Sequence, residues 1–390
     1  MDRPSSLLRP LVSLALAGVT FAPAVALACG GGITIENATI EIAQHVAFYS
    51  VREAGPTDVV VQLAVPQGSE PFGVILPVRG TPDLDPDPVE TSELRNLDIS
   101  TTPQLVYEDD AGGGSSDSGC GCGESALDGG GAGGGSGRGN GVDVLDVADI
   151  GPVTAVSFAA NDAEALDTWL DENGFVVPDA ARTTLEAYVD EGTTFIAFKR
   201  RSDASDLATS VGVHFTVPDA YDTYPLRMAA VGAASQLGIR VFLASEEGGR
   251  GPTAPFTSLT LDDLSTDLVR DEGYTAAVAT AVRGAGGRAF LVEGIFEPSS
   301  RWRDELGPRL SAMTSTQSTL TRLTTVIDRT ALTEDVTFDT PVETAPREIY
   351  LTAAARLGRP RPGPVKWGSV GVFALGTATV LIRRRRRNPG

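Results

Sequence analysis

Two stretches decide the fold class, Thr57–Val65 (TDVVVQLAV) and Phe72–Val78 (FGVILPV). Both are short apolar runs rich in β-branched residues and bounded by proline, glycine and polar residues, which is the pattern of buried β-strands. Residues 33–42 and 45–51 precede them with similar character. The spacing predicts an antiparallel meander or one half of a sandwich over residues 33–80. Pro77 cannot donate to a strand ladder, so it predicts a sheet edge or a strand end.

The rest of the chain alternates between strand and helix patterns, which predicts an α+β fold, mostly antiparallel strands with a few helices. Asn161 is the expected cap of the first helix, and Asn173-Gly174 is its expected stop. A Thr/Ser-rich segment follows a short helical stretch near Leu310, and no strand is predicted for that segment. Strands are expected at 152–158, 193–199, 210–217, 238–244 and 289–296, and helices at 162–172, 179–189 and 271–283.

A glycine-rich insertion separates the two patterned regions. Fifteen of the 31 residues from Ala111 to Gly141 are glycine. Such a segment buries too little apolar surface to offset the entropy lost on ordering, so residues 109–143 are expected to be disordered.

The N-terminus has the pattern of a secretory signal peptide. Arg3 and Arg9 form a basic start, an apolar run follows, and Ala26-Leu27-Ala28 is the small-x-small pattern of a cleavage site. Cleavage after Ala28 would make Cys29 the first residue. A lipoprotein signal, with acylation of Cys29, is the alternative.

The C-terminus has the pattern of a membrane anchor. The apolar residues 367–382 follow Lys366 and precede five arginines. With Lys366 reaching outward, about 18 residues are available, near the lower end of a spanning helix. The positive-inside rule then predicts a single pass with the tail in the cytoplasm and the preceding chain outside it. Removal of the tail at the cell surface by a sorting protease is the alternative. The residues that set the topology are Arg383, Arg384, Arg385, Arg386 and Arg387.

These patterns together predict seven regions. They are a signal peptide (1–28), an N-terminal β-rich region (29–108), a glycine-rich linker (109–143), an α+β region (144–355), a Pro/Arg stalk (356–366), a transmembrane helix (367–382) and an arginine-rich tail (383–390).

The exported part is strongly acidic. The whole chain carries −20, the first 28 residues +1, and Lys366 with the arginine cluster +6, which leaves −27 for the part between them. Such a surface repels phosphate backbones, so nucleic acid is not expected as a partner. The expected partners are the membrane, through the C-terminal helix, and a protein of the cell envelope.

The three cysteines are Cys29, Cys120 and Cys122. An oxidising compartment permits one disulfide among them and leaves one cysteine over. A zinc site is the alternative, but three cysteines with no histidine nearby fall short of four ligands.

The sequence carries no local catalytic motif. Gly-x-Ser-x-Gly, His-Glu-x-x-His and Ser-x-x-Lys patterns do not occur. His45 and His214 are the only histidines, and each is expected to be half exposed on a strand. Asp83, Asp85 and Asp87 alternate among three prolines, which favours a polar extended turn over a calcium loop. No catalytic, cofactor-binding or metal-binding residue, and no cofactor, is predicted.

Several short stretches, in their order along the chain, resemble a bacterial domain-of-unknown-function family numbered 2330. The resemblance spans about residues 29–340 and implies an exported or surface protein without a known activity. Family members often carry a second cysteine soon after the first, which Gly32-Ile33-Thr34 lacks, so a short local disulfide is ruled out. The stretches are Ala28-Cys29-Gly30-Gly31, Phe72–Val78 with Pro82, Trp169-Leu170 to Asn173-Gly174-Phe175, Val177-Pro178, Tyr188-Val189-Asp190-Glu191-Gly192, Phe195-Ile196-Ala197-Phe198-Lys199, Tyr224-Pro225-Leu226-Arg227-Met228, Thr321-Arg322-Leu323-Thr324-Thr325 and Leu332-Thr333-Glu334-Asp335.

The sequence thus favours an exported, membrane-anchored, non-enzymatic module that binds a partner in the cell envelope or supports its structure. An exported hydrolase with a non-standard active site is the alternative hypothesis.

Overall fold

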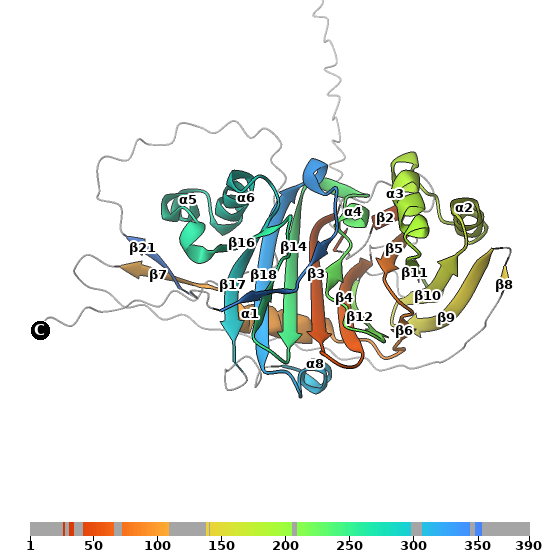
Figure 1. The fold of residues 1–390 in the computed structure, drawn as a ribbon, viewed down its shortest axis with the longest axis horizontal. Coiled ribbons are helices and arrows are strands. Elements are labelled where there is room, and N and C mark those ends of the chain that lie inside the picture. Colours follow the sequence, from red (N-terminus) through yellow and green to blue (C-terminus); the bar gives the residue numbers. More distant parts are fainter. Residues whose placement is uncertain are drawn as a thin grey trace, which may run out of the picture.

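The computed structural model describes residues 26–27, 31–34, 42–65, 72–108, 138–139, 141–204, 209–297, 306–343 and 348–352. It is a mixed α+β fold in which strands predominate, as predicted, and most strand pairs are antiparallel (Figure 1). Two main sheets, here called the large sheet and the small sheet, form its framework.

The large sheet has the order β16 (Thr257–Thr260), β17 (Ala289–Phe296), β18 (Thr319–Asp328), β14 (Ala233–Ser245), β3 (Ile42–Val51), β4 (Thr57–Val65), β12 (Thr209–Val217), β6 (Asp83–Leu84), with β1 (Ala26–Leu27) beside β3. The small sheet has the order β2 (Gly31–Thr34), β5 (Phe72–Val78), β11 (Thr194–Arg200), β10 (Val153–Ala160), β9 (Val142–Ile150), β8 (Arg138–Gly139). Three strand pairs complete the set: β13 (Thr223–Tyr224) with β19 (Val336–Thr337), β15 (Gly249–Gly251) with β20 (Thr340–Val342), and β7 (Gln104–Glu108) with β21 (Glu348–Thr352).

Helices cover the outer faces of both sheets (Figure 1). Leu94 of α1 and Leu310 of α8 pack against Phe48 and Phe242 on one face of the large sheet. Helices α2 and α3 cover the small sheet, and α5 and α6 pack into the core on the opposite face of the large sheet. The helices are α1 (Thr91–Thr101), α2 (Ala163–Glu172), α3 (Asp179–Asp190), α4 (Leu226–Ala229), α5 (Thr266–Asp271), α6 (Tyr274–Gly284), α8 (Pro308–Met313) and the 3₁₀ turns η1 (Leu261–Asp263) and η2 (Arg329–Ala331).

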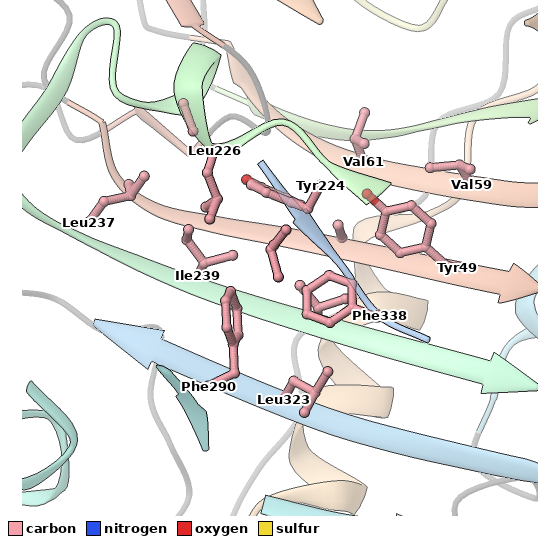
Figure 2. Close-up of a cluster of buried hydrophobic side chains, with 14 of the residues drawn as sticks. Tyr49, Val59, Val61, Tyr224, Leu226, Leu237, Ile239, Phe290, Leu323 and Phe338 are labelled. Atoms are coloured by element: carbon pink, nitrogen blue, oxygen red, sulfur yellow. The ribbon is translucent and has the colours of Figure 1, made fainter. Parts of the chain in front are cut away.

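A continuous apolar core joins the two sheets. Phe290 and Phe338 meet edge to face, with ring centroids 5.2 Å apart, a favourable arrangement for aromatic rings. Figure 2 shows these rings among Tyr224, Ile239 and Leu323, which come from three other strands. Strands from both sides of the glycine-rich segment therefore share one core, because β3 and β4 lie between β14 and β12.

The strands at 57–65, 72–78 and 289–296 match their predicted bounds, and the predicted helices near 162–172 and 179–189 are present. The prediction that residues 33–80 form one antiparallel meander or one half of a sandwich is wrong, because β5 belongs to the small sheet and not to the sheet of β3 and β4. The physical reason is that both faces of β5 are buried. Val74 and Leu76 face the common core, whereas Ile75 faces the core under α2 and α3.

Pro77 stands near a strand end, as predicted. On one side Pro77 pairs with Phe195 of β11. On the other side β2 pairs with β5 only as far as Ile75. The missing N–H of Pro77 therefore leaves no gap in the ladder with β2.

Two local predictions are corrected. The N-terminal cap of α2 is Asp162, whose side chain accepts from the backbone N–H of Ala165, and not Asn161. The Thr/Ser-rich segment after α8 is strand β18, which lies between β17 and β14. Its threonines are buried because both faces of the large sheet are covered at β18, with Leu323 in the common core and Leu320 in the core beside α1 and α8.

Several predictions fall outside the described residues. These are residues 1–25 and 28 of the predicted signal peptide (1–28), Cys29, residues 109–137 of the glycine-rich linker with Cys120 and Cys122, the stalk (356–366), the transmembrane helix (367–382) and the tail from Arg383 to Arg387. The linker was predicted to extend too far, because Arg138–Gly139 is β8 and β9 begins at Val142. Within the part of the chain that the structure describes, no helix is both long and apolar enough to cross a membrane.

Candidate functional site

His214 is held between two carboxylates. Its Nε2 lies 3.0 Å from Asp58 Oδ1 and its Nδ1 lies 2.9 Å from Asp85 Oδ2. The histidine is buried, with 7% of its surface exposed. Both ring nitrogens are therefore engaged by acidic side chains.

Strand pairing brings these three residues together. In the antiparallel pair of β4 and β12, His214 is opposite Val60 and Asp58 is opposite Thr216, so Asp58 and His214 are diagonal neighbours. The chain after β6 runs along the other edge of β12, where the backbone N–H of Asp85 donates to the carbonyl of His214 at 3.1 Å.

Gly212 allows this close approach. A Cβ at position 212 would lie 2.6 Å from the carbonyl oxygen of Val89, well inside contact distance. The two residues exchange backbone hydrogen bonds of 2.8 and 3.1 Å, which hold the Asp85 segment against β12. Only glycine fits this position without displacing that segment.

Two arginines complete the arrangement, here called the histidine clasp: Arg52, Asp58, His214, Asp85 and Arg309. Arg52 lies 2.7 Å from Asp58 Oδ2, and Arg309 on α8 lies 2.6 Å from Asp85 Oδ2. In the order given, basic and acidic side chains alternate along these five residues. The clasp joins the β3–β4 turn, β12, the chain after β6 and α8, which are far apart in the sequence.

The surroundings keep both aspartates ionised. Burial alone raises the pKa of Asp58, but hydrogen bonds from His214 and Arg52 outweigh it and hold that pKa below its usual value. Burial also acts to raise the pKa of Asp85, and it is outweighed by the backbone N–H of Asp87, His214 and Arg309, so the net shift is again downward.

The arrangement resembles part of a catalytic triad, in which a buried carboxylate orients a histidine. In a triad, however, the second ring nitrogen faces the nucleophile. Here Asp85 occupies that nitrogen. Both carboxylates can accept a hydrogen bond from the ring only when both ring nitrogens carry a proton. The clasp is therefore suited to holding charged side chains together and to linking distant elements of the fold.

The structure corrects the prediction for the histidines. Both are buried, and neither is half exposed, because other side chains cover them: Tyr224 covers His45, and Asp58, Asp85 and Arg309 surround His214. Burial lowers the pKa of His45 to about 3, and its Nδ1 contacts the hydroxyl of Tyr224. Asp85, which the sequence analysis placed only in a polar extended turn with Asp83 and Asp87, is a clasp residue that bonds to His214. Asp58 was also missed, although a lone acid inside the apolar run TDVVVQLAV was a usable signal.

The lowered pKa values of Asp58 and Asp85 predict a loss of stability in acid. Because the folded-state pKa lies below the unfolded value near 3.8, their contribution is complete above that value and is lost as the pH falls below it. We expect the free energy of unfolding, measured by urea titration, to fall between pH 6.5 and pH 3 in both proteins. The fall should be smaller in Asp58→Asn than in the unsubstituted chain. An equal loss in both proteins would contradict this assignment.

A second polar cluster, the arginine clamp, comprises Tyr188, Glu191, Arg227 and Asp335. Arg227 forms two bonds to Glu191, of 2.7 and 2.8 Å, and one of 2.9 Å to Asp335. Its guanidinium carbon lies 4.2 Å from the centroid of the Tyr188 ring, and the Tyr188 hydroxyl donates to Asp335 at 2.8 Å. The clamp ties α3, α4 and the segment before β19 together.

The clamp brings together residues from separate stretches of the sequence. Tyr188 and Glu191, Arg227, and Asp335 come from three of the stretches that carry the family resemblance. Hydrogen bonding by Arg227 lowers the pKa of Glu191, and burial with the charge of Asp335 raises the pKa of Tyr188. The cluster is therefore an ion pair with a neutral tyrosine donor.

A further stretch of the resemblance has a packing role. Trp169 packs against Phe158, with ring centroids 4.1 Å apart and the rings tilted by 32°. Gly174 ends α2 with a φ of +75°, a conformation that favours glycine. Lys199 contacts the carbonyl of Asn173 and lies 5.4 Å from the Phe175 ring, so it closes the same helix end.

Replacing Arg227 with alanine is expected to lower the free energy of unfolding by about 1–3 kcal/mol, because Asp335 loses a charged donor and Tyr188 loses its stacking partner. The loss of unfolding free energy in Arg227→Lys should lie between zero and the loss in Arg227→Ala, since lysine keeps the charge but cannot form the two parallel hydrogen bonds of the guanidinium group. Arg182→Ala, at an exposed pair with Asp167, is the matched control, with an expected cost of less than about 1 kcal/mol. Urea titration measures all three, and equal costs at 227 and 182 would contradict the clamp.

Metal binding finds no support among the described residues, which contain no group of three or more histidine, cysteine or acidic side chains placed to hold an ion. The three cysteines lie outside those residues.

Comparison with known proteins gave one match. A family model described as an uncharacterized protein conserved in bacteria, DUF2330, matches residues 23–339. No curated protein and no solved structure matches the chain.

Proposed function

The chain belongs to the DUF2330 family of uncharacterized bacterial proteins, and from that starting point we propose that it is an exported, single-pass membrane protein. Its outer part is a non-enzymatic module that binds a partner in the cell envelope or supports the envelope structure. The proposal follows the apolar run before Cys29 and the apolar segment before Arg383.

The observation that carries the non-enzymatic part is the double engagement of His214. A histidine that acts as a general base needs one nitrogen free to take a proton from the reacting group. Both nitrogens of His214 are bonded to carboxylates at 2.9 and 3.0 Å. The arginine clamp is satisfied in the same way, since each of its charges meets an opposite charge. Both clusters join distant segments, as the supports of a rigid binding surface would.

Mass spectrometry of the protein from separated membrane and secreted fractions tests the location. The proposal expects a chain that begins at Cys29, retains Arg383 to Arg387 and is found in the membrane fraction. Replacing the five arginines with alanine should release the protein or disturb its orientation, whereas replacing Arg359 and Arg361 in the stalk should not. Recovery of the unsubstituted protein mainly from the cytoplasm, with residues 1–28 intact, would refute export.

In-cell cross-linking tests the binding role. The module is expected to give a defined cross-linked species with an envelope component, and this species should persist in His214→Gln if the clasp only supports the fold. Absence of any stable species across the exposed surface would count against a binding role.

One observation favours a second candidate, an exported hydrolase. The buried hydrogen bond of Asp58 to His214 is the kind that orients a catalytic histidine. Labelling by activity-based probes for serine or carboxylate nucleophiles, lost in His214→Gln, would support this candidate. Absence of labelling in the unsubstituted protein would reject it.

A further inference from the structure

Strand β1 comes from the predicted signal peptide and is nevertheless part of the large sheet. It consists of Ala26–Leu27, which lie just before the expected cleavage point after Ala28. β1 pairs in parallel with the start of β3, from Ile42 to Gln44. The segment that processing would remove therefore supplies a strand to the fold.

β1 lies in a fork between β3 and β4. The ladder between these two strands joins residues 47–50 of β3 to residues 58–61 of β4. Ahead of that ladder, β14 pairs with Ile42 and Gln44 on one side of β3, so β1 takes the other side, which is the side of β4. β1 also lies close to β4, whose residues 62–65 continue past the ladder and pair with β12 on their far side. Residues 42–44 and 62–65 are here called the strand fork.

The surroundings of the strand fork define what it can hold. Leu63 and Val65 on this part of β4 are buried in the common core, with 0% and 1% of their surface exposed. A charged side chain would be costly to bury beside them. The fork is therefore suited to an extended, uncharged segment that runs parallel to β3, with main-chain hydrogen bonds supplying the affinity.

The processed chain has no segment of its own N-terminus with which to replace β1. Cleavage after Ala28 leaves two residues, Cys29 and Gly30, ahead of β2. β2 is held in the small sheet, where Gly31 is opposite Ile75 of β5. Moving the new N-terminus to the position of β1 would make β2 slip along β5 by three residues, and an odd shift turns every side chain of a strand to the opposite face.

We propose that the strand fork is a strand-acceptor site, which β1 occupies in the precursor and which, after cleavage, binds an extended apolar segment of an envelope protein parallel to β3. β1 then acts as an internal blocker that is removed on export. The occupant in the structure supports this chemistry, because β1 is itself an extended piece of an uncharged, apolar run. The inference rests on the proposed export, since the fork opens only when residues 1–28 are removed.

Amide hydrogen exchange compares the processed chain with Ala28→Leu, in which a large residue at the cleavage point blocks processing. Both proteins are purified from membranes in the same detergent, and their masses are measured first. The amides of the strand fork should exchange on the order of tenfold faster in the processed chain, about the effect of losing one hydrogen bond. The amides of β18, in the same molecules, should not differ. Equal exchange at the fork in the two proteins would overturn the proposal.

A synthetic peptide of residues 22–28 (APAVALA) is the probe for the site. It should bind the processed chain and restore protection at the strand fork, and it should bind Ala28→Leu on the order of tenfold more weakly, because β1 competes for the site. The matched control is the same peptide with methyl groups on the backbone nitrogens of Ala26 and Leu27, which removes the donors that face β3 and β4 and should abolish protection. Equal binding to both proteins, or binding without protection of the fork, would rule out a strand-acceptor site.

Failure of this inference and failure of the proposed export give different results. If the unsubstituted chain keeps residues 1–28, export is refuted, and a chain expressed without those residues takes its place in the same comparison, so the fork is still tested. Protection of the fork that rises with protein concentration in the absence of peptide would show that a second copy fills the site, and it would overturn the envelope partner.

Discussion

Replacing Arg322 with methionine is expected to lower the free energy of unfolding by about 3–5 kcal/mol, because it leaves a buried carboxylate without its counter-charge. Arg322 is 2% exposed and Glu293 is fully buried. The Nε of Arg322 donates to Glu293 Oε2, which also accepts from Thr324 at 2.7 Å. The hydroxyl of Tyr274 donates to the other oxygen of Glu293.

The same arginine also reaches α1. Its Nη1 donates to the carbonyl of Asp98 at 2.7 Å and to Thr101 Oγ1 at 2.9 Å, and it lies 2.8 Å from the Asp98 carboxylate. Arg240 pairs with that carboxylate from β14. Loss of Arg322 therefore weakens the docking of α1 as well as the core of the large sheet.

Urea titration measures the effect, and two controls interpret it. Arg270→Met removes an exposed pair with Asp267 and should cost much less stability than Arg322→Met, because solvent screens exposed ion pairs. The double variant Glu293→Leu with Arg322→Met removes both charges and should recover much of the stability lost by Arg322→Met alone. A double variant no more stable than the single one would show that packing, and not the unpaired charge, sets the cost.

A chain that ends at Asp339, the end of the matched family region, is expected to be less stable than one that ends at Thr352 by at least about 2–5 kcal/mol. The reason is that β20 and β21 belong to the folded body. Strand β20 pairs with β15, and β21 pairs in parallel with β7. Ile349 on β21 is 3% exposed and packs in the common core.

Both truncated chains lack the stalk and the apolar C-terminal segment, so their difference isolates β20 and β21. Thermal unfolding followed by circular dichroism compares them. Ile349→Ala in the full chain should reproduce most of the difference, since it removes the buried side chain and keeps the backbone pairing. Equal unfolding temperatures for the two truncated chains would mean that the folded unit is complete at residue 339.

The buried polar clusters of the fold could not have been predicted from the sequence, whereas several of its long strands and helices could. β4, β5 and β17 are apolar runs rich in β-branched or aromatic residues, α2 has its own cap in Asp162, and a glycine with positive φ follows both α2 and α3. Such signals depend on residues within a few positions of one another, so they can be interpreted without knowing the fold.

The charged residues inside strands were visible in the sequence, but their partners were not. Asp58, Glu293 and Arg322 each interrupt an apolar or Thr-rich run, and burial of a charge requires an opposite charge nearby. Asp58 meets His214 at a separation of 156 residues, and Arg309 meets Asp85 at a separation of 224. No local pattern specifies such pairs, because they depend on which strands become neighbours.

The sequence by itself determined the class of the fold, the positions of several of the long strands and of α2, α3 and much of α6, and the family resemblance. Only the tertiary structure decided that β5 leaves β3 and β4 for the small sheet, that β3 pairs in parallel with β14, and that Thr319–Asp328 is a buried strand. It also decided that His214 lies between two aspartates. The physical reason is that burial on both faces, strand order and charge pairing follow from contacts between distant segments, whereas local propensity records only the nearest neighbours along the chain.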